Sequence, residues 1–104
     1  MCGADIDIVN NYKYTALMIA CYRNHYEIVT YLIDHKASLN IKSLYGITEL
    51  MICCKKGFYK IVEYLVDHGA DVNAVSTYGY TALMYACQKN DFNIAKLLIE
   101  NNAS

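Results

Sequence analysis

The chain carries the sequence Thr-Ala-Leu-Met at residues 15–18 and again at residues 81–84, and the variant Thr-Glu-Leu-Met at residues 48–51. Each copy begins 33 residues after the one before it. Three other blocks keep the same offset, for example Tyr-Leu-Ile-Asp at residues 31–34 and Tyr-Leu-Val-Asp at residues 64–67. Several blocks in one register indicate an array of short stacked units rather than one globular core.

Each unit has the apolar spacing of two short helices. In the first unit, Leu17, Ala20 and Cys21 follow the i, i+3, i+4 pattern of a helix with one apolar face. The second helix carries the same kind of pattern at Ile28, Val29, Leu32 and Ile33. Residues 37–47 and 70–80 are too short and too rich in turn residues for a further helix, and we expect extended or hairpin-like connections there.

The expected helix ends carry residues suited to them. A threonine precedes each first helix, and its hydroxyl is expected to accept a hydrogen bond from an unpaired backbone N–H group. These threonines are Thr15, Thr48 and Thr81. Between the two helices lie Asn24, Gly57 and Asn90, which tolerate a left-handed backbone. Glu49 falls at the first helical position, where a negative charge meets the positive helix end.

This pattern resembles the ankyrin repeat family. The third unit reads His-Gly-Ala-Asp-Val-Asn-Ala at residues 68–74 and Tyr-Gly-Tyr-Thr-Ala-Leu-Met-Tyr-Ala-Cys at residues 78–87. These stretches are similar to the family's Gly-Ala-Asp-Val-Asn-Ala and Gly-x-Thr-Pro-Leu-His-x-Ala-Ala. The resemblance covers nearly the whole chain and implies an all-α solenoid of helix–turn–helix units joined by β-hairpin-like loops. It implies the tail of a preceding repeat at 2–9, repeat 1 at 10–42, repeat 2 at 43–75 and a truncated repeat 3 at 76–104.

The departures from the family pattern bear on stability. Methionine replaces the family's histidine in all three units, and Glu49 stands where the family has proline. Lys13 and Lys36 replace glycines, and a lysine in a left-handed conformation costs about 1 kcal/mol. Repeat 1 is therefore predicted to be the least stable. Neither end of the chain resembles a polar capping unit, so we expect either an excerpt of a longer array or a protein with exposed apolar ends. Such uncapped ends are expected to self-associate.

Composition argues against several classes of protein. The chain has 9 basic and 10 acidic residues, a net charge of −1 that gives no general attraction to nucleic acid or anionic membranes. Apolar runs such as residues 17–21 are far shorter than the ~18 residues that span a bilayer. Glycines occur singly and not as a phosphate-binding cluster. No nucleophile–histidine–acid motif is recognisable, so we expect no enzyme.

The cysteines and histidines have structural interpretations. Cys21, Cys54 and Cys87 share one repeat position, where stacked helices lie ~8–10 Å apart, beyond the ~7 Å that a disulfide spans. No metal-ligand spacing occurs, and we expect these thiols to fill small buried positions without metal or cofactor. Free thiols favour an intracellular compartment, cytoplasmic or nuclear. His35 and His68 end the second helices, where their charge is favourable.

The candidate binding residues lie in the loop tips and the first helices. Tyrosine combines a large contact area with a hydroxyl that water can satisfy, and loop tips are exposed by default. In the ankyrin family these positions form the concave face, which implies a partner protein. Carried over by position, the face comprises Tyr12, Tyr14, Tyr22, Arg23, Leu44, Tyr45, Ile47, Lys55, Lys56, Tyr78, Tyr80, Gln88 and Lys89. Alternatively, some tip tyrosines pack only on the next loop.

The basic members of this set recur at one repeat position or its neighbour and are expected to form a stripe. The stripe favours a partner protein with an acidic patch. Two other functions are a structural spacer within a longer multidomain protein and nucleic-acid or nucleotide binding on the stripe. The family resemblance also makes Asn73 a candidate for asparaginyl hydroxylation. The alternative is that Asn73 only hydrogen-bonds across its loop.

Overall fold

A computed structural model describes residues 5–39 and 41–103 of the chain. Parts of the expected preceding-repeat tail, together with Asn40 and Ser104, lie outside the described residues. The described part is all-α, as predicted, and contains no strand. Its helices are α1 (Ala16–Tyr22), α2 (Tyr26–Asp34), α3 (Glu49–Lys56), α4 (Tyr59–Asp67), α5 (Ala82–Lys89) and α6 (Phe92–Glu100).

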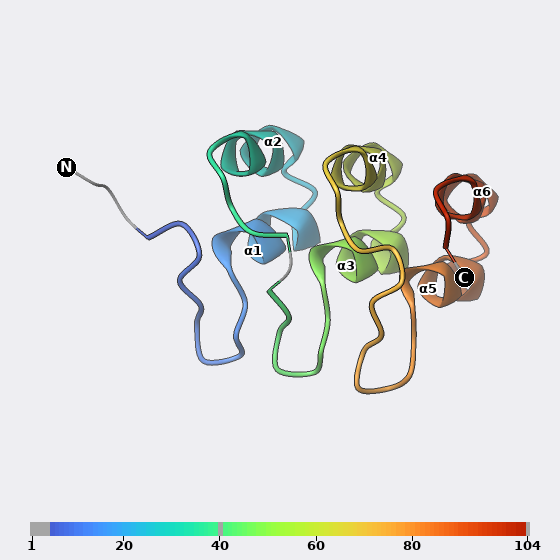
Figure 1. Cartoon of the computed structure of the whole chain (residues 1–104), viewed down its shortest axis with the longest axis horizontal. Helices are drawn as coiled ribbons and strands as arrows, with labels where there is room; N and C mark the ends of the chain where they lie inside the picture. Colours follow the sequence, from blue (N-terminus) through green and yellow to red (C-terminus); the bar gives the residue numbers. More distant parts are fainter. Residues whose placement is uncertain (1–4, 40, 104) are drawn as a thin grey trace.

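The six helices form two rows, with loops extending to one side (Figure 1). The first helices α1, α3 and α5 form one row, and the second helices α2, α4 and α6 form the other. The loop after a second helix runs past the row of first helices, turns as a hairpin and returns to the next first helix. We call residues 10–14, 43–47 and 76–80 the hairpin tips. Each tip is closed by a backbone hydrogen bond of 2.9–3.0 Å from its first residue to the carbonyl of its last.

The predicted threonine caps are confirmed. Each threonine hydroxyl accepts a hydrogen bond from the backbone N–H group of the methionine three residues later, at 3.1–3.3 Å. These bonds satisfy one of the unpaired donors at the start of each first helix. They also fix the angle at which each hairpin enters its helix, because the capping residue is extended.

The left-handed positions are also where the sequence predicts them. Asn24, Gly57 and Asn90 have φ values of 59°, 81° and 63°. Lys13 and Lys36 have φ values of 63° and 76°, although each carries a β-carbon. Repeat 1 therefore contains two lysines in a conformation that L-residues with side chains avoid.

The core lies between neighbouring repeats as much as within them. Helix α3 packs on α1 on one side and on α5 on the other. Six of its eight residues are buried, against four of seven in α1 and three of eight in α5. The second helices add their own buried side chains, including Ile61, Leu65, Ile94 and Leu98.

Two predicted core positions are exposed. Ile28 was expected on the apolar face of its helix, but its side chain is 50% exposed, because Val29 takes the buried position on α2. Cys87 was expected to be buried like its repeat equivalents, but it lies on a face of α5 that no other described helix covers. Cys21 and Cys54 are buried as predicted, and so is Cys53.

Polar and aromatic contacts join the second helices. The Tyr64 hydroxyl donates a 2.6 Å hydrogen bond to the Asp34 carboxylate, which raises the pKa of Tyr64 to about 12. The ring of Tyr26 meets the ring of Tyr64 edge-on, with centroids 6.0 Å apart. Among the described residues, no helix is long and apolar enough to cross a membrane.

Replacing Lys36 with glycine is expected to stabilise the array. Relief of the left-handed strain is partly offset by the greater freedom of glycine in the unfolded chain, so we expect a gain of about 0.5–1 kcal/mol. Urea unfolding followed by circular dichroism measures the difference.

The matched control is the opposite change at the equivalent position of the next repeat. Gly69 has φ 91° and no atom within 4 Å of the place a β-carbon would take. Gly69→Lys should therefore lose a similar amount through backbone strain alone. Unchanged stability in both variants would contradict the assignment of strain to these turns.

Candidate partner-binding surface

The hairpin tips present tyrosine side chains in two different settings. Tyr12, Tyr45 and Tyr78 share one repeat position and are 64%, 51% and 64% exposed. Tyr14 and Tyr80 share the other position and are half-buried against the core, as is Ile47 at the equivalent place in the second tip. Leu44 is exposed beside Tyr45. The exposed rings of Tyr12, Tyr45 and Tyr78 are therefore available for contact, whereas the half-buried side chains pack each tip against the core.

Neighbouring tips also contact one another. The backbone N–H group of Leu44 donates to the Tyr12 carbonyl at 3.0 Å. The backbone N–H group and the hydroxyl of Thr77 both donate to the Tyr45 carbonyl, each at 3.0 Å. The rings of Tyr45 and Tyr78 stack with centroids 5.9 Å apart. The alternative that tip tyrosines pack on the next loop therefore holds for these two rings, although both remain about half exposed or more.

A groove of about 380 Å³ lies between the tips and the first helices. Met51 and Ile52 of α3 form its buried floor together with Tyr85 of α5, whose ring lies 5.1 Å from that of Tyr80. All three repeats contribute to the lining, which consists of Tyr14, Tyr22, Tyr45, Ile47, Met51, Ile52, Lys55, Lys56, Tyr78 and Tyr85.

The floor was missed from the sequence. Ile52 and Tyr85 share one repeat position with Ile19, but only their side chains line the groove. The helical spacing from Lys55 and Lys56 back to Met51 and Ile52 was the available signal, because residues four apart lie on one face of a helix.

Basic side chains lie at the C-terminal end of the first helices. Arg23, Lys55 and Lys56 are exposed, and the ammonium group of Lys56 lies 4.3 Å from the centre of the Tyr22 ring in the preceding repeat. A cation over an aromatic face is attracted by the ring quadrupole. The sequence singled out both residues but not their pairing across repeats.

Lys89 reaches back toward the preceding repeat. Its side chain crosses Gly57, with Cε 2.8 Å from the place a β-carbon of that residue would take. The carboxylate of Asp91 lies beside the same point. Gln88 lies next to the groove, in an adjoining hollow that it shares with Lys55, Tyr78, Tyr80 and Tyr85.

A larger hollow, of about 470 Å³, lies on the outer side of α1. Its lining includes Ile8, Val9 and Ile19 together with the carboxylate of Asp5, and it contains no basic side chain. The groove differs from this hollow in combining exposed aromatic rings with cations, and it draws its lining from all three repeats, so it is the better candidate for a specific binding site.

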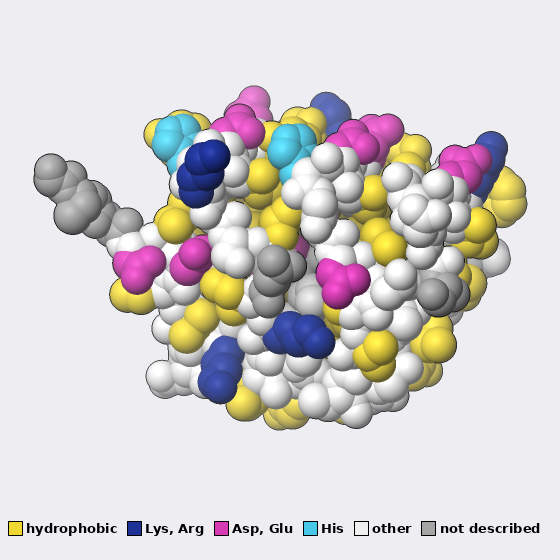
Figure 2. All heavy atoms as spheres, in the orientation of Figure 1, with side chains coloured by type: hydrophobic (Ala, Val, Ile, Leu, Met, Phe, Trp, Pro, Cys, Tyr) yellow, Lys and Arg dark blue, Asp and Glu magenta, His cyan; other side chains and the backbone are white. Residues whose placement is uncertain are grey.

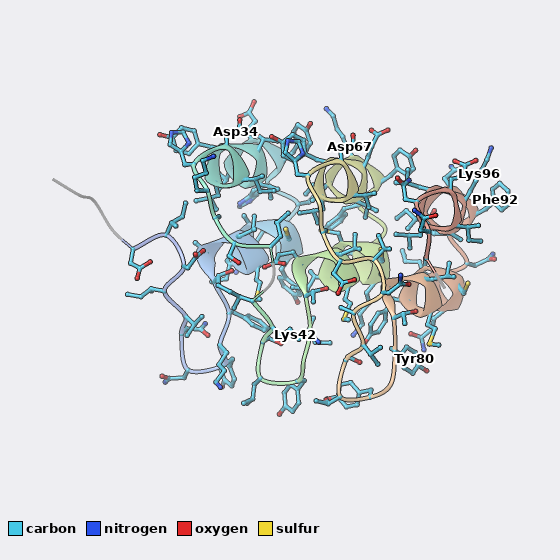
Figure 3. All side chains as sticks on the ribbon, in the orientation of Figure 1. Asp34, Lys42, Asp67, Tyr80, Phe92 and Lys96 are labelled. Carbon is cyan, nitrogen blue, oxygen red and sulfur yellow. The ribbon has the colours of Figure 1, made fainter. Side chains whose placement is uncertain are left out.

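Charge is distributed unevenly over the molecule. In the face shown in Figure 2, histidines and several carboxylates lie over the second helices together with basic side chains, whereas the described residues of the hairpin side show basic and hydrophobic side chains without carboxylates. Figure 3 shows Asp34 and Asp67 at the second helices. The same view shows Lys42 and Tyr80 on the hairpins.

The acidic residue of the first helices is buried. Glu49 is 1% exposed, and its Oε2 atom has no hydrogen-bond partner. Burial, with a smaller contribution from the Asp7 carboxylate, raises the pKa of Glu49 from 4.5 to about 7. Glu49 lies at the start of α3, as predicted. The effect of desolvation on its pKa is larger than the opposite effect of the backbone hydrogen bond at the helix start, which lowers the pKa.

The remaining chemical candidates have structural roles. Within residues 5–39 and 41–103, no group of three His, Cys, Asp or Glu side chains is arranged to hold a metal ion. The rings of His35 and His68 stack on Tyr31 and Tyr64, each with centroids 4.0 Å apart. The Nδ1 atom of each histidine lies 2.8–2.9 Å from the tyrosine carbonyl one turn earlier. These histidines close the ends of the second helices.

Asn73 takes part in hydrogen bonds of its turn. Its backbone N–H group donates to the Asp71 carboxylate at 2.9 Å, and its amide group donates to the Asn102 carbonyl of the next repeat at 3.2 Å. The side chain therefore links successive turns. Hydroxylation of Asn73 remains a prediction.

Comparison with known proteins agrees with this architecture. A family model described as ankyrin repeats (3 copies) matches residues 1–76 and 36–104. The chain belongs to the ankyrin repeat family. It is also similar to the protein fem-1 homolog A-like of Mus musculus, with 42% identity over 40 residues. That alignment covers 38% of this chain and 6% of the mouse protein, so the chain corresponds to a small part of that relative.

Replacing Glu49 with glutamine is expected to change the pH dependence of stability. Between pH 4.5 and about pH 7 the folded chain holds a proton on Glu49 that the unfolded chain has lost. The free energy of unfolding of the wild type therefore falls as the pH rises through this range, by up to about 3 kcal/mol, and does not recover above it. Glutamine cannot titrate, so the variant should lack this fall in urea unfolding at pH 5 and pH 8.

Glu63→Gln is the matched control, because Glu63 is exposed on α4. It should reproduce the wild-type profile. If Glu49→Gln gave the same pH dependence as the wild type, the buried carboxyl would not be its source.

Proposed function

We propose that this chain binds another protein in the groove between its hairpin tips and first helices. Ankyrin repeats are generally protein-interaction modules, and solenoids of this kind use their extended concave surfaces for binding. The observation that supports this face is the groove itself, which joins tyrosines from three repeats to a buried apolar floor and to two lysines of α3. The proposed contact residues are those that the sequence analysis named, with Met51, Ile52 and Tyr85 added.

The side chains suit this role physically. Tyrosine provides a large contact area with few torsions to immobilise, and it is enriched among the residues that dominate binding energy at interfaces. The stacking of Tyr45 on Tyr78 holds two such rings in place before a partner arrives. A surface that is already ordered loses less conformational entropy on binding.

The buried thiols favour a binding role over a catalytic one. Burial raises the pKa of Cys54 to about 12, and the pKa of Cys53 is raised above its usual range by a hydrogen bond to Cys21 and by burial. A thiol that stays protonated is a poor nucleophile. A purely structural spacer would have no need for the exposed rings of Tyr12, Tyr45 and Tyr78.

The double variant Tyr45→Ala/Tyr78→Ala is expected to lose binding without losing its fold. Removing two aromatic contacts should weaken the affinity for a captured partner at least tenfold, as for residues that dominate an interface. Affinity capture with the wild-type and variant arrays, followed by titration of a shared protein, measures the effect. Circular dichroism should report an unchanged helix content, because both rings are exposed.

Tyr31→Ala is the matched control, because Tyr31 is exposed on α2 in the other row of helices. Proteins captured by the wild type and by this control, but not by the double variant, would support the groove. Partners that bind all three arrays equally would place the binding site elsewhere.

A further inference from the structure

The net charge of −1 conceals two sides of opposite sign. Residues 8–24, 41–57 and 74–90 make up the hairpins and first helices and contain six of the nine basic residues. Their one acidic residue is Glu49. The rest of the chain contains the other nine acidic residues and three basic ones. The groove side therefore carries an excess of positive charge, and the second-helix side an excess of negative charge.

The buried position of Glu49 increases this difference. Its carboxylate is 1% exposed, so it offers no accessible anion to the lysines at the rim. Lys55 and Lys56 are exposed at the edge of the groove, and Lys56 rests on the Tyr22 ring. An anionic ligand would meet these cations without competition from an acidic side chain within the groove lining.

The array also sets a spacing for such a ligand. Arg23, Lys56 and Lys89 occupy one position in successive repeats, and packed helices lie about 8–10 Å apart. An extended peptide in the polyproline II conformation advances about 3.1 Å per residue with three residues per turn, so three residues cover one repeat and every third side chain points the same way. Acidic residues at every third position of a peptide would therefore meet successive cations, while the side chains between them face the tyrosines and the apolar floor.

We propose that the groove binds an extended acidic peptide segment with a carboxylate at every third residue and apolar or aromatic side chains between. The inference rests on the proposed function and names the chemistry of its partner. The carboxylates pair with the basic rim, and the apolar side chains enter between the tips and α3. The second-helix side, with its excess of carboxylates, repels the same segment and so orients it on the array.

The test is selection from a display library of random peptides about twelve residues long on the immobilised array. Twelve residues in the polyproline II conformation span about 37 Å, which is close to the 44 Å length of the molecule. We expect enriched peptides to carry Asp or Glu at every third position. A fluorescent copy of the most enriched peptide is then titrated by anisotropy, beside a copy with the same composition and its acidic residues grouped at one end.

The variants separate local from overall charge. Lys56→Glu removes the central cation of the row and should weaken the periodic peptide at least tenfold. Lys96→Glu changes the net charge equally, but on α6, and should change the affinity less than twofold. The grouped peptide should bind at least tenfold more weakly than the periodic one.

The outcomes are distinguishable. Enriched peptides without periodic acidic residues that still require Tyr45 and Tyr78 would overturn this inference and leave the proposed groove intact. Peptides that bind the Tyr45→Ala/Tyr78→Ala array as well as the wild type, or no enrichment at all, would count against both. Tighter binding of a single-stranded oligonucleotide of similar length than of the periodic peptide would assign the basic rim to nucleic acid and overturn the inference.

Discussion

Burial between neighbouring first helices is the interaction on which the rest of the structure depends. A single pair of short helices has too little apolar surface to fold by itself, and stacking makes the core continuous. Helix α3 has a packed neighbour on both sides and buries six of its eight residues. The cost of the strained lysine turns and of the buried Glu49 carboxyl is met by this stacking. The hairpins can then project from one side, because the first helices already pack the repeats together.

The fold could be predicted from the sequence because its determinants are local and repeated. The threonine caps and the left-handed turns depend on a few adjacent residues, and each occurs at a fixed offset. What could not be predicted depends on neighbours in space. Ile28 follows the helical apolar pattern but lies outside the contact with α1 and α4, and Cys87 has the sequence of a buried position without a covering helix.

The candidate site was predicted only in part, for the same reason. The exposed tyrosines and lysines could be named because loop tips and helix ends are surface positions in any array of this family. The floor of the groove and the pairing of Lys56 with Tyr22 arise only when repeats stack. The pKa of Glu49 likewise depends on its burial in the folded array, which cannot be deduced from its position at the start of a helix. The groove is thus a property of the assembled array and not of any one repeat.

The hydrogen bonds between hairpin tips have a mechanical consequence. Whole apolar faces join the helices, whereas one or two hydrogen bonds join each pair of tips, so the array is more compliant along its hairpin edge than along its helical edge. The connection between the second and third hairpin tips is the stronger one, because Thr77 donates two hydrogen bonds to the Tyr45 carbonyl and the rings of Tyr45 and Tyr78 stack. The first and second hairpin tips are joined by the single hydrogen bond from Leu44 to Tyr12, because leucine lacks the hydroxyl that Thr77 has at the equivalent position. We therefore expect the array to bend more easily between its first two hairpins, while the groove beside Tyr78 keeps its shape.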